Sequence, residues 1–115
     1  MTAAAKAGRL THGLPLRPLA DEMVDTLCER PDLRIERIVS TGQITPDGHW
    51  YDQDHDEWVL MVKGSARLRI EGETEDRKLE EGDYIFLPAH CRHRVTWTQS
   101  EPPTVWLAIH LFTKC

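Results

Sequence analysis

The middle of the chain contains the two stretches that decide its fold, "EWVLMVKG" (residues 57–64) and "GDYIFLPAHCRH" (residues 82–93). The first stretch begins with Glu57 and ends with a glycine seven residues later. The second begins with a glycine and ends with His93 eleven residues later. Each contains a short apolar run next to Gly or Pro, which is the pattern of a β-strand that ends in a turn.

The segments around these two stretches are also predicted to be strands. Residues 33–40 alternate at period two, with Leu33, Ile35, Arg37 and Val39 on one face and Arg34, Glu36, Ile38 and Ser40 on the other. Further strands are expected at residues 58–62, 66–71, 84–87, 93–98 and 104–112, separated by Gly or Pro turns. Six or more short strands with no long helix between them indicate a sandwich or a barrel.

The first thirty residues have a different pattern. Residues 1–19 mix Ala, Gly and Pro without periodicity, which predicts an extended arm. In residues 20–30, by contrast, Met23, Val24 and Leu27 are spaced as one face of a short helix, and a proline follows. We therefore expect one short helix between the arm and the first strand.

The composition excludes several classes of partner. The formal net charge is −5, and the scattered Lys and Arg residues form none of the basic clusters that phosphate neutralisation in nucleic-acid binding requires. The longest apolar runs are far too short to span a membrane. The three cysteines are an odd number without a CxxC pair, which favours a reducing cytoplasm. A small-molecule ligand or a protein partner is expected instead.

The two opening stretches, about twenty residues apart, resemble the two signature motifs of the cupin superfamily. The resemblance covers residues 35–111 approximately, and it implies an all-β fold, a double-stranded β-helix or jelly-roll barrel. The expected organisation is an N-terminal arm with a short helix over residues 1–30 and a cupin β-barrel domain over residues 31–115.

The first motif carries over only in part, and the second departs from the family at His90, where many members have glycine, and at Trp97, which replaces an asparagine. The second motif carries over onto Gly82, Pro88 and His93. In the first motif, Glu57 and Gly64 stand at the glutamate and closing-glycine positions. In the family, two histidines and a glutamate from the first motif and a histidine from the second surround a divalent metal in the barrel mouth.

The two missing histidines change the expected metal chemistry. Tyr51 and Gln53 stand where the family has them. An amide oxygen is a weak, hard donor and a phenol ligates strongly only when deprotonated, so a transition-metal site here is weakened. The resemblance still implies a mixed oxygen and nitrogen site at Gln53, Glu57 and His93, for a divalent ion such as Fe, Mn, Ni, Cu or Zn.

We expect a small-molecule pocket lined by Tyr51, Gln53, Glu57 and His93. The candidate catalytic residues are Glu57, His93 and Tyr51. Glu57 and His93 would hold a metal or shuttle a proton, and Tyr51 would act as an acid or an orienting group. Isomerase, lyase or dioxygenase chemistry suits this set. The alternative is a non-catalytic ligand-binding or sensing domain without metal, with Glu57 and His93 simply hydrogen-bonded to each other. Strand alternation places Trp97 on the same side as His93.

The other histidines leave alternatives open. His49 belongs to a polar turn, whereas a loop can fold His55 towards the pocket. His90 fits either the pocket rim or an exposed turn. Trp106 and His110 share one face of their strand, and they enter the pocket if that face lines the barrel.

A homodimer is the expected assembly. A strand-rich domain of 115 residues leaves sheet edges that need cover, because unpaired backbone groups of an edge strand pair readily with another chain. The family resemblance points in the same direction, since similar cupins are often dimers.

Overall fold

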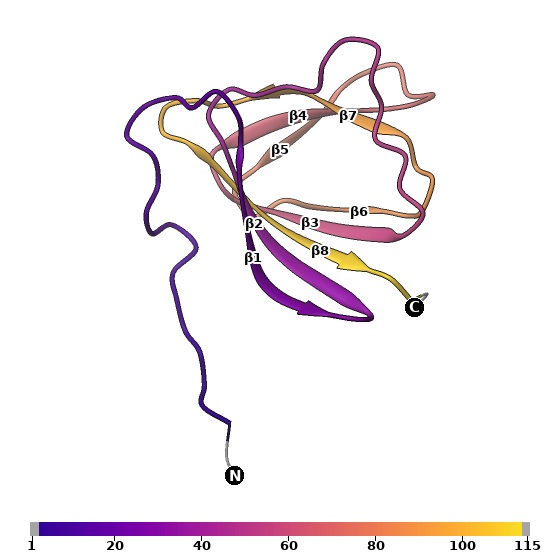
Figure 1. The fold of residues 1–115 in the computed structure, drawn as a ribbon. Helices are drawn as coiled ribbons and strands as arrows, with labels where there is room; N and C mark the ends of the chain where they lie inside the picture. Colours follow the sequence, from indigo (N-terminus) through magenta and orange to yellow (C-terminus); the bar gives the residue numbers. More distant parts are fainter. Residues whose placement is uncertain (1–2, 114–115) are drawn as a thin grey trace.

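The computed structural model describes residues 3–113, and every regular element in this range is a β-strand. Figure 1 shows the strands in two layers, with the arm that precedes them extending away from both. The all-β class predicted from the sequence is confirmed. In chain order the strands are β1 Met23–Arg30, β2 Leu33–Ser40, β3 Asp56–Lys63, β4 Ser65–Ile70, β5 Arg77–Glu80, β6 Tyr84–Leu87, β7 His93–Thr98 and β8 Thr104–Leu111.

The two layers are a five-stranded sheet in the order β1-β2-β8-β3-β6 and a three-stranded sheet in the order β5-β4-β7. All the strand pairs within them are antiparallel. The chain first passes from one sheet to the other at Gly64, between β3 and β4, and it crosses again after β5, β6 and β7. This arrangement encloses an interior between the sheets, as in a jelly-roll barrel.

The short helix predicted within residues 20–30 is wrong, because this segment forms β1. It pairs along its length with β2, from Met23 opposite Val39 to Arg30 opposite Leu33. The register shifts between Thr26 and Cys28. The residues that were interpreted as one helical face lie on both faces of this strand, since Val24 lines the cavity between the sheets and Leu27 does not. Pairing with a neighbouring strand therefore decided the conformation over local propensity.

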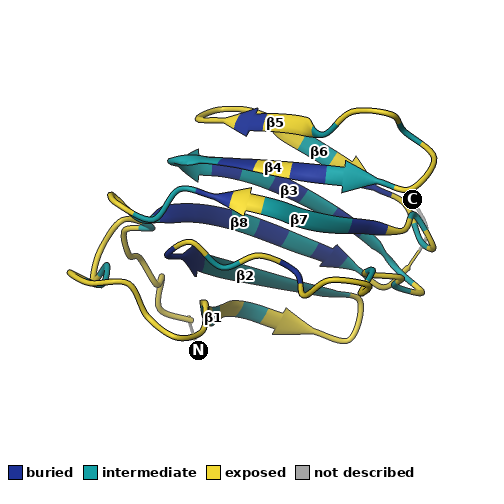
Figure 2. Cartoon of the chain, turned by 90° about the horizontal axis from the view of Figure 1, so that it is seen from above, coloured by how far each residue is buried: buried dark blue, intermediate teal, exposed yellow. Residues whose placement is uncertain are grey.

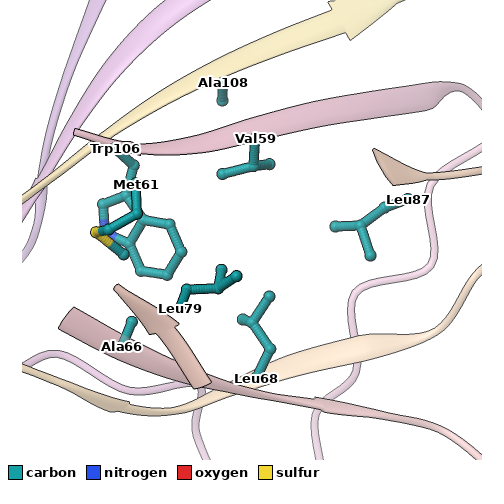
Figure 3. Packing of buried hydrophobic residues seen from close by; sticks show 8 residues of the cluster. All are labelled: Val59, Met61, Ala66, Leu68, Leu79, Leu87, Trp106 and Ala108. Atoms are coloured by element: carbon teal, nitrogen blue, oxygen red, sulfur yellow. The ribbon is translucent and has the colours of Figure 1, made fainter. Parts of the chain in front are cut away.

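The core lies between the two sheets. Figure 3 shows Val59 and Trp106 from the five-stranded sheet facing Leu68 and Leu79 from the three-stranded sheet. Leu79 lies on β5, a short charged strand that was not predicted from the sequence. In Figure 2, buried residues lie along β8 and β4, whereas β1 and the arm are largely exposed. None of the described residues, 3–113, forms a helix long and apolar enough to cross a bilayer.

The irregular segment between β2 and β3 covers the edge of β7. The backbone N–H of Thr45 donates to the carbonyl of Val95 at 2.9 Å. Further along, Tyr51 and His93 exchange two backbone hydrogen bonds, of 2.7 and 3.1 Å. The side chains that follow Thr45 are therefore held against the start of β7, which carries the second sequence motif.

Candidate functional site

A cavity of about 260 Å³ lies between the two sheets. Its apolar wall consists of Val24, Ile38, Val59, Leu68, Leu87, Val95 and Trp106. Its polar wall consists of Glu22, Glu36, Tyr51, Gln53, Glu57, His93 and His110. All four residues predicted to line a pocket are among them. The cavity therefore brings together side chains from every strand except β5, from Glu22 before β1, and from the segment between β2 and β3.

Glu57 is the most constrained carboxylate of the cavity. It is the second residue of β3, where burial alternates from residue to residue and places Glu57 on the inner face with Val59. Only 8% of the residue is exposed. The side-chain amide of Gln53 donates from Nε2 to Glu57 Oε1 at 2.8 Å. This bond fixes the orientation of the carboxylate.

His93 presents one ring nitrogen to the cavity. The backbone carbonyl of Cys91 can only accept a hydrogen bond, so the 2.8 Å contact with His93 Nδ1 places the proton on that nitrogen. In the neutral ring, Nε2 is then an acceptor. The ring stacks on Tyr51 with a centroid separation of 5.4 Å, and only 6% of His93 is exposed.

His110 is part of a hydrogen-bonded chain that reaches the cavity. Its Nε2 lies 2.7 Å from Glu36 Oε1 and 3.9 Å from Glu57 Oε2. Its Nδ1 lies 2.9 Å from His55 Nε2. Because the Glu36 carboxylate accepts from His110 Nε2–H, a neutral His110 accepts from His55 Nε2–H. The loop before β3 thus folds His55 towards the site, and the face of β8 that carries His110 lines the barrel.

Two cavity carboxylates, Glu22 and Glu36, were not predicted as site residues. Glu36 is on the inner face of β2, and its partner His110 is on β8. Glu22 is exposed as a whole residue, but its side chain reaches the cavity wall and lies 3.4 Å from Ser40 Oγ. Loss of water raises the pKa of Glu22; the Ser40 hydrogen bond opposes this rise and the charge of Glu36 adds to it. The cavity therefore concentrates negative charge.

The same environment acts on the phenol of Tyr51. Loss of water raises its pKa above the ordinary value, and the charges of Glu22 and Glu57 add to the rise, against a hydrogen bond with Thr45. Tyr51 therefore keeps its proton at neutral pH and can donate it to an oxygen atom in the cavity.

Other candidates lie outside the cavity. Trp97 is 44% exposed and does not share the side of His93, because the pairing of β4 with β7 shifts between Arg67 and Leu68 and reverses the alternation. His49 is exposed. His90 is also exposed and lies 2.8 Å from Asp52 Oδ1.

The donors in the cavity do not fit the imidazole-rich site that transition metals prefer. Among residues 3–113, no three His, Cys, Asp or Glu side chains are grouped closely enough to hold an ion. Of the set Gln53, Glu57 and His93, only His93 offers an imidazole, and the Gln53 amide turns its nitrogen towards Glu57. The metal role of these three residues stays a prediction.

Comparison with known families identifies the chain. The family model described as "Cupin domain" matches residues 36–110, which is more than half of the sequence. The chain belongs to the cupin family. The resemblance of the two sequence motifs is therefore confirmed, and so is the β-barrel architecture that it implied for this cupin.

Solved structures give the same result. A protein from Ralstonia eutropha JMP134 described as a "putative mannose-6-phosphate isomerase" is 49% identical, with 95% of this cupin and 100% of that chain covered and a TM-score of 0.90. A cupin superfamily protein from Desulfitobacterium hafniense DCB-2 is 17% identical over 87% of this chain and 84% of that one, with a TM-score of 0.71, and shares the fold. No curated protein matches.

Proposed function

We propose that this cupin binds a small carbonyl compound in the barrel mouth and catalyses an isomerase-type proton transfer on it. The observation that carries the proposal is the Glu57 carboxylate, which is 8% exposed, lines the cavity, and is oriented by Gln53. A buried carboxylate whose orientation is fixed in this way is suited to remove a proton from a carbon atom next to a carbonyl group.

The other predicted catalytic residues complete the transfer. Glu57 takes the proton from the carbon, and the electron pair of that C–H bond forms a C=C bond as the carbonyl oxygen takes a proton from Tyr51. His93 Nε2 accepts the proton of the neighbouring hydroxyl group, since Nδ1 is already protonated towards Cys91. Return of the proton from Glu57 to the adjacent carbon produces the isomer, and transfer of the proton on His93 through solvent to the Tyr51 phenolate restores both side chains. Each proton transfer then has a side chain on the cavity wall.

Two further observations support this reaction class. The similar Ralstonia eutropha protein, 49% identical, is described as a "putative mannose-6-phosphate isomerase", and the reaction class of that description, though not its phosphorylated substrate, agrees with the proposal. The apolar wall, which includes Trp106 and Leu68, would displace water from around a bound compound, and loss of water strengthens the electrostatic interactions of the acid and the base. The proposed steps use side chains only, so chelators are expected to leave the rate unchanged.

The test is deuterium incorporation from heavy water into a panel of small aldoses and ketoses, followed by proton NMR. Wild-type protein should exchange the proton next to the carbonyl group of at least one compound. Glu57→Gln should lower that rate by about 10²–10⁴-fold. Glu75→Gln is the matched control, because Glu75 is exposed on the turn before β5.

Three results would contradict the proposed function or one of its parts. Exchange that is equal in Glu57→Gln and wild type would exclude Glu57 as the base. Binding without exchange of any compound would favour the non-catalytic alternative. Loss of exchange on chelation, together with a stoichiometric ion that disappears in His93→Ala, would replace the proposed reaction with a metal-dependent one.

A further inference from the structure

The charged side chains on the cavity wall all carry the same sign. Three carboxylates, Glu22, Glu36 and Glu57, line it, and the lining contains no Lys or Arg. We propose that the cavity selects uncharged or cationic small molecules and excludes phosphate esters. This inference rests on the proposed function, because it names the class of compound on which the proton transfer acts.

Little positive charge compensates the three carboxylates. Arg34 Nε lies 3.3 Å from Glu36 Oε2, but Arg34 is not part of the cavity lining. Glu22 contacts Ser40 Oγ, and Glu57 contacts the Gln53 amide and, at 3.9 Å, Nε2 of the His110 ring, which it shares with Glu36. A negative potential therefore remains inside the cavity.

A phosphate group needs contacts of a different kind. Phosphate sites in proteins use Arg or Lys side chains, or backbone N–H groups at a helix N-terminus. Residues 3–113 form no helix, and the cavity lining has neither cation. At a separation of several Å and an effective dielectric constant of about 20, each carboxylate would weaken the binding of a phosphate group by about tenfold or more.

The size and the remaining lining favour a compact polar molecule. A volume of about 260 Å³ is slightly below the range of about 300–1,000 Å³ that is usual for drug-sized ligands. Tyr51 can donate to a hydroxyl oxygen, whereas Glu57 and His93 Nε2 can accept from hydroxyl or ammonium groups. The aromatic ring of Trp106 offers an apolar surface beside them. An unphosphorylated sugar or an amino sugar has this combination of groups.

The test compares D-mannose, D-mannosamine and D-mannose 6-phosphate, which share one carbon skeleton and differ in charge. Binding is measured by NMR from the shift of the Trp106 indole N–H, because this side chain lines the cavity. D-mannose 6-phosphate should bind at least about tenfold more weakly than D-mannose. Protonated D-mannosamine should bind at least as tightly as D-mannose. Glu22→Gln should reduce the advantage of D-mannosamine, and Glu75→Gln should preserve it.

Tighter binding of D-mannose 6-phosphate than of D-mannose would overturn the inference, and so would the absence of any Trp106 shift with all three sugars. The proposed function fails separately. If D-mannose 6-phosphate binds tightly and its C2 proton exchanges, the ligand class is wrong and the isomerase reaction remains. If D-mannose is preferred and no carbonyl compound exchanges, the ligand class holds and the reaction does not.

Discussion

Replacement of Gly64 by alanine should destabilise the barrel far more than the same change at Gly72. Both glycines have a left-handed backbone, with φ of 88° at Gly64 and 90° at Gly72. At Gly72 an added Cβ meets no atom within 4 Å, whereas at Gly64 it would lie 2.9 Å from both Cα and Oγ1 of Thr104. Thr104 is fully buried, and its hydroxyl donates to Gln99 O at 2.8 Å, so it cannot move aside freely.

The magnitudes follow from these contacts. A left-handed alanine costs roughly 1–2 kcal/mol, partly offset by about 0.4–1 kcal/mol from the less flexible unfolded chain, so Gly72→Ala should lose about 0.5–1 kcal/mol. Gly64→Ala adds an overlap in a packed interior, which costs about 1–3 kcal/mol more. With a urea m value of about 1–2 kcal/mol/M, the two midpoints should differ by about 0.5–3 M. Equal midpoints would refute the close approach of β3, β4 and β8 at this position.

Three further predictions concern charge, packing and assembly. Because the pKa of Glu22 is raised in the folded protein, the free energy of unfolding falls as the pH rises from the ordinary glutamate pKa through the raised one. Glu22→Gln should remove this loss, so the variant should be more stable than wild type at neutral pH and equally stable at a pH below the ordinary glutamate pKa. Trp106→Phe should cost about 1 kcal/mol or more in urea unfolding, because the indole N–H loses its 3.0 Å bond to buried Ser40, whereas Trp97→Phe, at an exposed position, should change stability by less than about 0.5 kcal/mol. Light scattering should give about twice the monomer mass of 13.2 kDa. Phe86→Asp, which changes an exposed residue of the edge strand β6, should shift the mass towards that of the monomer. A wild-type monomer at high concentration would contradict the predicted homodimer.

The sequence pattern predicts strands well wherever alternation is unbroken. In β2, period two identifies both faces, and Glu36 and Ile38 do line the cavity. The error in β1 arose because its apolar residues do not alternate on one face, since Val24 lines the cavity and Leu27 does not. The error at Trp97 occurs at a bulge, where the register shift between Arg67 and Leu68 turned this side chain outward. A bulge depends on the partner strand, which a single sequence does not identify.

The site is predictable only in the part that the two motifs contain. Spacing and alternation brought Glu57 and His93 to one cavity from strands far apart in the sequence. Glu36 carried a weaker signal, because it shares a face of β2 with Ile38 but also with the polar residues Arg34 and Ser40. Glu22 carried none, since its place on the wall depends on how β1 pairs with β2.

The most direct measurement is the phenol pKa of Tyr51, because it reports whether the acidic side chains meet inside the barrel mouth. Tyr51 and Tyr84 are the two tyrosines of the chain, so Tyr84→Phe leaves Tyr51 as the single phenol for a ¹³C NMR titration. We predict a pKa above the ordinary tyrosine value, which falls when Glu22 and Glu57 are both changed to Gln. An ordinary pKa that does not respond to the two substitutions would contradict the convergence of these residues on one cavity.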